Sequence, residues 1–370
     1  MYTQYVNSKR EEIQNAMKIQ RQILVDNYLP LQETKDIIYN KKRNLWEREI
    51  DQADFLDLRL GIGSTELAGT INFPQEHFSL DSDNLLQEVY KLGAESRTLE
   101  NVPISISFVE KNISAIIGTA SNKQQFIEGL ILQMITYHSY EDLKIVLMTN
   151  EKNASKWDYL KVCPHCWSND KTIRYFAKNL DEAKEISLAL EQELQSRKYK
   201  DTNGTRELND ADYKKYKPYY VIITDDFKSV RDVELVKDVA GMPINVGFSL
   251  IVISPRLVNL PNECKTFISI GDKKSGVFEN ELVSNKQKEF DADVDQTLNM
   301  YECCKILANI PIDIAKENQV LPLSLTFLEM YNVGMIEQLN ILNRWKSNDP
   351  TKTLQTPVGV DKAGELFKLD

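Results

Sequence analysis

The pattern of apolar and polar positions changes twice along the chain and divides it into three stretches. The first, residues 1–50, is dense in charge and in strong helix formers, with apolar residues recurring at roughly helical spacing. Pro30 interrupts this pattern, and a proline inside a helix removes a backbone donor and clashes with the preceding turn. The first stretch is therefore predicted to be a helical stalk or linker of two helices, broken at Pro30.

Two interpretations of these helices stay open. They form an amphipathic pair packed on the main domain, or they form a stalk that leads from an upstream segment, such as a membrane segment. Docking on the main domain would use apolar side chains of the second helix, namely Ile37, Ile38, Leu45 and Trp46.

The second stretch, residues 51–310, has the rhythm of an α/β domain. It opens irregularly, with short strands predicted at 58–63 and 101–108, and then alternates apolar runs with amphipathic stretches. Strands are predicted at 113–117, 143–148, 219–224, 248–253 and 264–270, and helices at 123–138, 181–198, 230–239 and 292–307. The last helix would place Val294, Leu298, Tyr301 and Cys304 on one face. Repeated strand–helix–strand units predict a mainly parallel sheet with helices on both faces.

The third stretch, residues 311–370, loses this rhythm after Pro311. One short helical stretch is followed by strand-like pieces at 358–361 and 366–370, which resemble a hairpin around residues 362–364. The sequence ends inside a strand-like element. We therefore expect residues 311–370 to be a linker and the lead-in strands of a following module in a longer protein.

Composition and charge narrow the class of protein. The chain has 370 residues, 42% hydrophobic and 27% charged, with a net charge of −10. That balance argues against a nucleic-acid-binding face, which needs clustered Lys and Arg. No apolar run approaches a membrane-spanning length, and the first residues do not resemble a signal peptide. Five cysteines, an odd number without framework spacing, fit a reducing compartment, so a cytoplasmic location is expected.

The segment Gly118–Gln125 lies between a predicted buried strand and an amphipathic helix, where a phosphate-binding loop would lie. Such a loop reads G-x-x-x-x-G-K-[ST], with glycines that let backbone amides surround the phosphates. Here Lys123 stands where the second Gly is needed, Gln124 replaces the Lys, and Gln125 replaces the Mg²⁺-binding hydroxyl. The segment is therefore interpreted as a degenerate loop, with no catalytic residue and no bound ATP or Mg²⁺ expected in this chain.

The run Val221–Asp226 has the form of a Walker B segment, an apolar strand that ends in acidic residues. One Asp would hold Mg²⁺ and a following carboxylate would activate water. Many strands end in Asp, and the alternative role for Asp225 or Asp226 is to cap the next turn. Without a Lys in the loop, the pair supports the fold more than it supports chemistry.

Cys163-Pro-His-Cys166 invites a zinc or thiol-redox interpretation. Zinc needs four ligands, no second motif of this kind is present, and His77 and His138 are distant in sequence. Cys303 and Cys304 are neighbours, which point about 100° apart on a helix. No metal site is therefore expected, and redox activity is disfavoured.

Several long motifs resemble the type VII secretion ATPases of the EssC/EccC kind, in the type VIIb branch of the Firmicutes. Leu45–Glu49 and Asp54–Gly63 are similar to the lead-in of the domain before the ATPase modules in that family. Leu321–Tyr331, Ile341–Pro350 and Pro357–Asp361 resemble the linker into its first FtsK/SpoIIIE-like module.

This resemblance implies a place in a longer, membrane-anchored protein. Forkhead-associated domains and two membrane helices would precede this region, and ATPase modules with competent sites and their own ATP and Mg²⁺ would follow it. Gly118 would match a degenerate loop, Asp225 and Asp226 its Walker B position, and Cys163–Trp167 a structural Leu-Pro-His-x-Trp-like turn with incidental cysteines.

The resemblance also suggests what the chain does. A non-catalytic, ATPase-like coupling module on the cytoplasmic side of the membrane is expected. The alternative is a nucleotide-binding or nucleotide-hydrolysing translocase module. Implied partners are other modules and copies of the same secretion ATPase, secreted WXG-type proteins and other secretion components.

Overall fold

The computed structural model forms two compact units, Met1–Asn309 and Ile310–Asp370, and each is described by itself. It describes residues 2–73, 84–198, 212–264, 266–279, 288–312, 326–331, 336–339, 341–347, 349, 356–360 and 366–369. Some sequence features lie outside the described residues, namely His77, residues 321–325, Pro350, Asp361 and the expected turn at 362–364.

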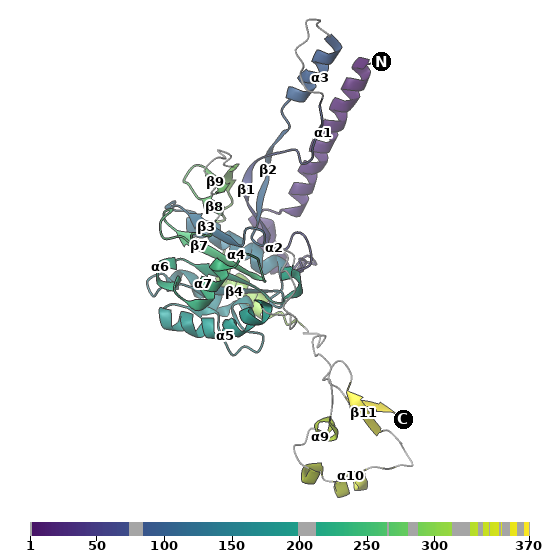
Figure 1. The fold of residues 1–370 in the computed structure, drawn as a ribbon, viewed down its shortest axis with the longest axis vertical. Helices are drawn as coiled ribbons and strands as arrows, with labels where there is room; N and C mark the ends of the chain where they lie inside the picture. The colour runs from purple at the N-terminus through teal and green to yellow at the C-terminus, as the bar shows by residue number, and fades with distance from the viewer. Residues whose placement is uncertain are drawn as a thin grey trace. The chain divides into compact units, whose positions relative to one another are not determined.

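Two helices open the first unit, α1 (Tyr2–Asn27) and α2 (Leu31–Asn40), with Pro30 at the N-cap of α2. The predicted break at Pro30 is therefore present. Helix α2 packs on the main body with Ile37 and Ile38 fully buried, whereas α1 buries only Val6 and projects beside a third helix, α3 (Asn84–Ala94) (Figure 1). Each helix thus fits a different interpretation: α2 packs on the main domain, and α1 extends away from it as a stalk would.

Ten strands form one sheet in the order β2-β1-β10-β9-β8-β3-β7-β6-β4-β5. Their bounds are β1 Asp57–Glu66, β2 Thr98–Ser107, β3 Ile113–Ile117, β4 Leu143–Met148, β5 Phe176–Ala177, β6 Tyr219–Thr224, β7 Phe248–Ser254, β8 Thr266–Ser269, β9 Ser275–Glu279 and β10 Lys288–Ala292. Pairings from β8 to β5 are parallel and those from β2 to β8 are antiparallel, which makes five of the nine pairings among these described strands parallel. The mainly parallel α/β fold is confirmed.

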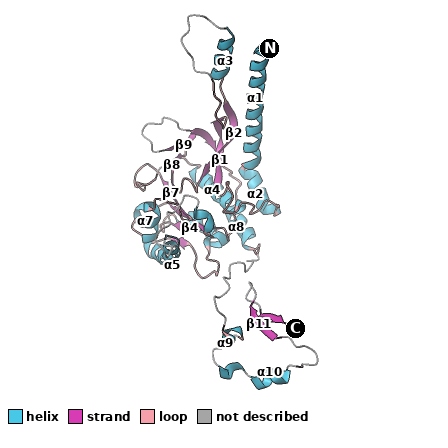
Figure 2. Ribbon diagram, turned by 45° about the vertical axis from the view of Figure 1, so that its right-hand side comes forward, coloured by secondary structure: helices cyan, strands magenta, loops and turns pink. Residues whose placement is uncertain are grey.

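Helices cover both faces of the parallel strands (Figures 1 and 2). Alternate residues of β4, β6 and β7, such as Val146, Ile222 and Leu250, pack with α5 (Leu180–Lys198), α6 (Phe227–Val230) and α7 (Glu234–Gly241). Opposite them lie α4 (Lys123–Tyr137) and α8 (Met300–Ala308), which contact each other and α2. Every residue of β3, β4, β6 and β7 is buried, as parallel strands enclosed on both faces require.

Three helix predictions were wrong in extent. The second helix of the first stretch ends at Asn40, so Leu45 and Trp46, which were predicted to lie on it, lie in a turn that follows it. The predicted helix 292–307 begins only at Met300, because Lys288–Ala292 pairs as β10 and the Asn299 side chain accepts a hydrogen bond from the Glu302 amide as an N-cap. Its supposed inner face fails as well, since Val294 and Tyr301 are exposed and only Cys304 is deeply buried. The predicted helix 230–239 is split into α6 and α7 by extended backbone at Val233.

The second unit contains short elements. They are α9 (Phe327–Met330), a 3₁₀ turn η5 (Ile336–Leu339), α10 (Ile341–Ser347) and two strands, β11 (Thr356–Val360) and β12 (Leu366–Leu369). The strands β11 and β12 pair antiparallel, so the predicted pairing of these two segments is present.

Candidate functional site

Gly118 directly follows β3, at the edge of the sheet where the parallel strands have their carboxyl ends. Its backbone has φ +134°, a conformation that side chains rarely allow, and a Cβ here would lie 2.3 Å from the Ile270 carbonyl oxygen. Its amide donates to the Ser254 carbonyl at 3.2 Å. Glycine is therefore required for close contact between strands, and this amide is already occupied rather than free for a phosphate.

Lys123 begins α4 and turns its side chain back into the loop. Its Nζ donates to the carbonyl oxygen of Gly118 at 2.7 Å and to that of Ser254 at 3.4 Å. Burial lowers the pKa of Lys123, and the nearby Lys156 ammonium adds to the effect, while Asp225 opposes it. The ammonium thus lies against backbone carbonyls of the two strand ends, in the corner where a phosphate-binding loop would hold its ligand.

Gln124 and Gln125 follow on the first turn of α4 and lie half-buried. The Gln124 side-chain amide donates to Glu128 at 3.2 Å, one turn along the same helix. Neither side chain supplies a cation or a hydroxyl, so the structure places no group of the required chemistry at these two positions.

Asp225 and Asp226 follow β6 at the same edge. The two Asp225 oxygens accept hydrogen bonds from Thr149 at 2.6 Å and from the Trp157 indole at 3.1 Å. Asp226 accepts from Asn150 at 3.1 Å and from Ser229 at 2.8 Å. Both carboxylates are therefore held by protein donors, and Asp225 lies close enough to influence the Lys123 charge.

Sequence reasoning missed the donors that hold these carboxylates. Thr149 and Asn150 directly follow β4, and Trp157 lies in the 3₁₀ helix η1 (Ala154–Val162). The positions of Thr149 and Asn150 could have been predicted, because the carboxyl ends of neighbouring parallel strands meet at one edge of the sheet. No sequence pattern indicated Trp157.

The Cys163–Cys166 segment forms a second 3₁₀ helix, η2 (Pro164–Cys166). The structure brings Cys304 of α8 to it, which sequence reasoning had set aside together with Cys303. Among the described residues, no group of three or more His, Cys, Asp or Glu side chains is arranged to hold a metal ion. His138 contributes its backbone carbonyl, which lies 2.9 Å from Nε2 of His165.

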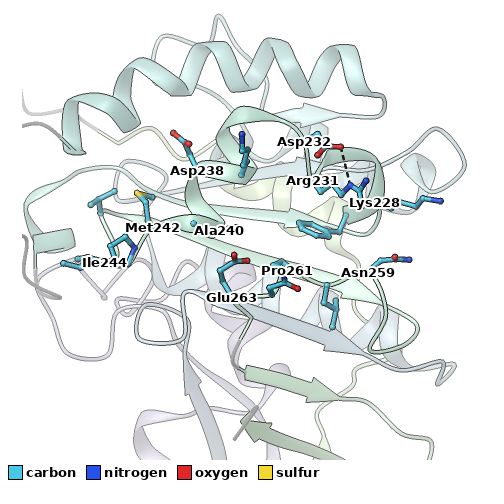
Figure 3. Close-up of a pocket in the computed structure, with 17 residues that line it drawn as sticks. Lys228, Arg231, Asp232, Asp238, Ala240, Met242, Ile244, Asn259, Pro261 and Glu263 are labelled. Carbon is cyan, nitrogen blue, oxygen red and sulfur yellow. Dashed lines mark hydrogen bonds and ion pairs between the residues drawn. The ribbon is translucent and has the colours of Figure 1, made fainter. Parts of the chain in front are cut away.

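A groove of about 790 Å³ lies between α6–α7 and the segment that follows β7 (Figure 3). Charged side chains such as Lys228, Asp238 and Glu263 surround apolar ones such as Met242 and Pro261. None of the sequence-predicted site residues lines it. The groove is therefore separate from the corner formed by Gly118, Lys123 and Asp225.

Comparison with known proteins gives one consistent result. The type VII secretion system protein EssC of Staphylococcus aureus aligns with the whole chain at 27% identity. The ESX secretion system protein EccC of Geobacillus thermodenitrificans aligns with the whole chain at 22% identity. The chain is homologous to these EssC and EccC proteins. It spans about a quarter of their length, 25% and 24% respectively.

Solved structures agree at the level of the fold. The cytoplasmic domain of the Thermomonospora curvata type VII secretion ATPase EccC superposes with a TM-score of 0.51 at 14% identity, over 76% of this chain and 34% of that one. At that identity the likeness shows a shared ATPase-like α/β fold and no more. No family model matches the chain. Among the described helices, none is both long and apolar enough to cross a membrane.

Proposed function

We propose that this chain is a non-catalytic, ATPase-like module of a membrane-anchored type VII secretion motor. It would lie on the cytoplasmic side of the membrane and couple the membrane part of the protein to ATPase modules that follow. Homology over the whole chain to EssC and EccC supports the secretion role. Its partners in this proposal are neighbouring modules and other copies of the same protein, together with exported proteins.

The position of Lys123 carries the non-catalytic part of the proposal. Phosphoryl transfer needs positive charge against the β- and γ-phosphates and a held Mg²⁺, because positioning and electrostatics supply nearly all of the catalysis. Here the Lys123 ammonium is hydrogen-bonded to the Gly118 and Ser254 carbonyls. A phosphate placed against those carbonyl oxygens would meet partial negative charge instead of amide donors.

The acidic residues Asp225 and Asp226 also support a non-catalytic role. Asp225 and Asp226 accept hydrogen bonds from Thr149, Trp157, Asn150 and Ser229, so their oxygens serve as acceptors within the fold. This corner then acts as structure: it ties the ends of β3, β4, β6 and β7 together. The module would transmit movement as a rigid body rather than generate it.

The competing function is nucleotide binding or hydrolysis by this chain, and Mg-ATP separates the two. A site with 10 µM Kd in 1 mM Mg-ATP would add about 2.7 kcal/mol of stability and raise the melting temperature by several degrees. We expect no shift with Mg-ATP or Mg-ADP and no steady-state turnover. Turnover that disappears in the Asp225→Ala/Asp226→Ala double variant would establish the hydrolase instead.

A further inference from the structure

Three buried thiols meet on the face of the sheet covered by α4 and α8, away from the groove of Figure 3. Cys163 is the N-cap of η2, Cys166 is its last residue, and Cys304 lies on α8, about 140 residues later in the sequence. All three are 0% exposed. The Cys166 and Cys304 thiols both lie close enough to the Cys163 sulfur to affect its pKa, so Cys163 is the centre of the cluster. All five cysteines of the chain are free.

Backbone geometry aligns Cys163 with Cys166. The Cys166 amide donates to the Cys163 carbonyl at 3.1 Å, which closes a 3₁₀ turn between residues i and i+3. A turn of this kind brings the Cα atoms of residues i and i+3 within about 7 Å of each other, close to the range that a disulfide spans. A bond between the two sulfurs therefore needs no movement of a distant element.

His165 supplies a base for the central thiol. Its Nε2 lies 2.9 Å from the His138 carbonyl oxygen, which can only accept, so Nε2 carries a proton. Its Nδ1 lies 3.6 Å from the Cys163 sulfur. A nucleophile, a base and a third group that orients the base are thus in contact, which is the arrangement that activates thiols in other proteins.

The charge balance in the cluster follows from these contacts. Burial alone would raise the pKa of Cys163, but hydrogen bonds from Cys166 and Cys304 and the His165 imidazole hold that pKa well below its usual range. Burial and the hydrogen bond to Cys163 raise the pKa of Cys166. The hydrogen bond to Cys163, together with burial, raises the pKa of Cys304. These contacts therefore favour ionisation of Cys163 over ionisation of Cys166 or Cys304.

We propose that Cys163 and Cys166 form an oxidisable dithiol, with Cys163 as the attacking thiolate positioned by His165 and Cys304, and that a small hydroperoxide converts the pair to a disulfide. Cys163 attacks one peroxide oxygen of H₂O₂; the O–O bond breaks, and the released hydroxide takes up the proton that His165 received from the Cys163 thiol and leaves as water. Cys163 is then a sulfenic acid. The Cys166 sulfur attacks the Cys163 sulfur, the S–O bond breaks, and the Cys166 proton leaves with hydroxide as a second water. Two thiols are oxidised and one peroxide is reduced.

Complete burial sets the size of oxidant that can react. H₂O₂ is close to water in size and can enter through local opening of the short 3₁₀ segments, whereas a bulky aromatic disulfide or maleimide needs far larger openings. Folded protein should therefore resist bulky thiol reagents and still lose two thiols to H₂O₂. The reaction should be reversed by dithiothreitol.

The experiment treats the folded 370-residue chain with H₂O₂, blocks the remaining thiols after unfolding, and maps the peptides by mass spectrometry. We expect three blocked thiols per chain and one Cys163–Cys166 disulfide. Five blocked thiols would overturn the proposal, as would a disulfide from Cys163 to Cys304 in place of Cys166.

Three variants test the individual roles. In Cys166→Ser, Cys163 should stop at the sulfenic acid and be trapped by dimedone. In Cys304→Ala, the disulfide should form at least several-fold more slowly, because the thiolate loses a donor. Cys303→Ser is the matched control: Cys303 is also buried on α8 but bonds to Tyr39, so its loss should leave the rate unchanged. Equal rates in Cys304→Ala and Cys303→Ser would remove Cys304 from the site.

Discussion

The parallel and antiparallel halves of the sheet are built on different principles. In the parallel half, β3, β4, β6 and β7 are buried at every position and rest on apolar contacts. In the antiparallel half, each of β1, β2, β9 and β10 carries exposed or half-exposed positions as well as buried ones. Ion pairs support that half: Arg59 of β1 pairs with Asp293, which follows β10, at 2.6 Å, and Lys35 of α2 pairs with Asp295 at 2.9 Å.

The difference shows where each half is vulnerable. Removing one apolar group from a buried strand leaves a cavity, whereas removing one partner of a buried ion pair leaves an uncompensated charge. The antiparallel half should therefore respond most strongly to charge substitutions. The parallel half should respond to charge only where a titratable group, such as His138, is buried against it.

The largest effect is expected from the ion pair of the antiparallel half. Arg59 and Asp293 side chains are 8% and 17% exposed, and Arg59 also donates to the Tyr28 carbonyl. Arg59→Met should lower the free energy of unfolding by about 3 kcal/mol, since Asp293 would remain as a buried, unpaired carboxylate. Urea denaturation measures this change.

A double variant sharpens the comparison. Arg59→Met with Asp293→Leu removes both charges and should recover most of the loss. If the double variant is as unstable as Arg59→Met, packing and the bond to Tyr28 account for the effect, and the two halves do not differ in the way described.

A smaller effect, dependent on pH, is expected beside the parallel half. The pKa of His138 is lowered to about 3, mainly by burial. A hydrogen bond with the Met134 carbonyl opposes this shift, and the nearby charges of Arg48 and His165 add to it. An unfolded histidine titrates near 6.5, so between about pH 6.5 and 3 the unfolded state binds a proton that the folded state does not. Stability should thus fall as the pH falls, by about 2 kcal/mol from pH 7 to pH 5.

His138→Gln isolates this contribution. A glutamine oxygen can still accept the Leu56 amide that now donates to His138 Nε2. Denaturation at pH 7 and at pH 5 should show that the variant loses the extra sensitivity to acid. An unchanged pH dependence in the variant would assign the effect to other groups.

The smallest effect is expected where the segment after α2 meets α4. Trp46 is half-buried, donates from its indole to the Ile135 carbonyl at 3.0 Å and packs edge-on against Tyr140. Trp46→Ala should lower the free energy of unfolding by about 1–2 kcal/mol, less than a fully buried tryptophan would. Trp345→Ala is the control, because Trp345 is 72% exposed and its loss should leave the melting of the first unit unchanged.

Sequence patterns predicted the parallel half well for a physical reason. Strands buried on both faces read as continuous apolar runs, and runs such as 219–224 and 248–253 coincide with β6 and β7 to within one residue. The antiparallel half carries no such local signal. Strands β9 and β10 are short and half-exposed, and β10 depends on pairing with β1, more than 200 residues earlier.

The candidate site was predictable in part for the same reason. Gly118 and Asp225 follow apolar strands, and their shared edge follows from a parallel sheet. The hydrogen bond from Trp157 to Asp225 and the contact of Cys304 with Cys163 depend on tertiary packing between η1, η2 and α8. Neither contact produces a periodic pattern of residues in the sequence, so neither could be predicted from residue spacing.

Helix α1 has a mechanical consequence. With 26 residues it is about 39 Å long, so a tilt of about 10° at its inner end would carry its outer end through about 7 Å. Gln20 bonds to the backbone of Glu66 and Ala68 at the end of β1, and Arg10 pairs with Glu95 just beyond α3. Helix α1 is thus joined at two levels to the segment that runs from β1 through α3 to β2. A small rotation at either end of this arm is amplified into a large displacement at the other.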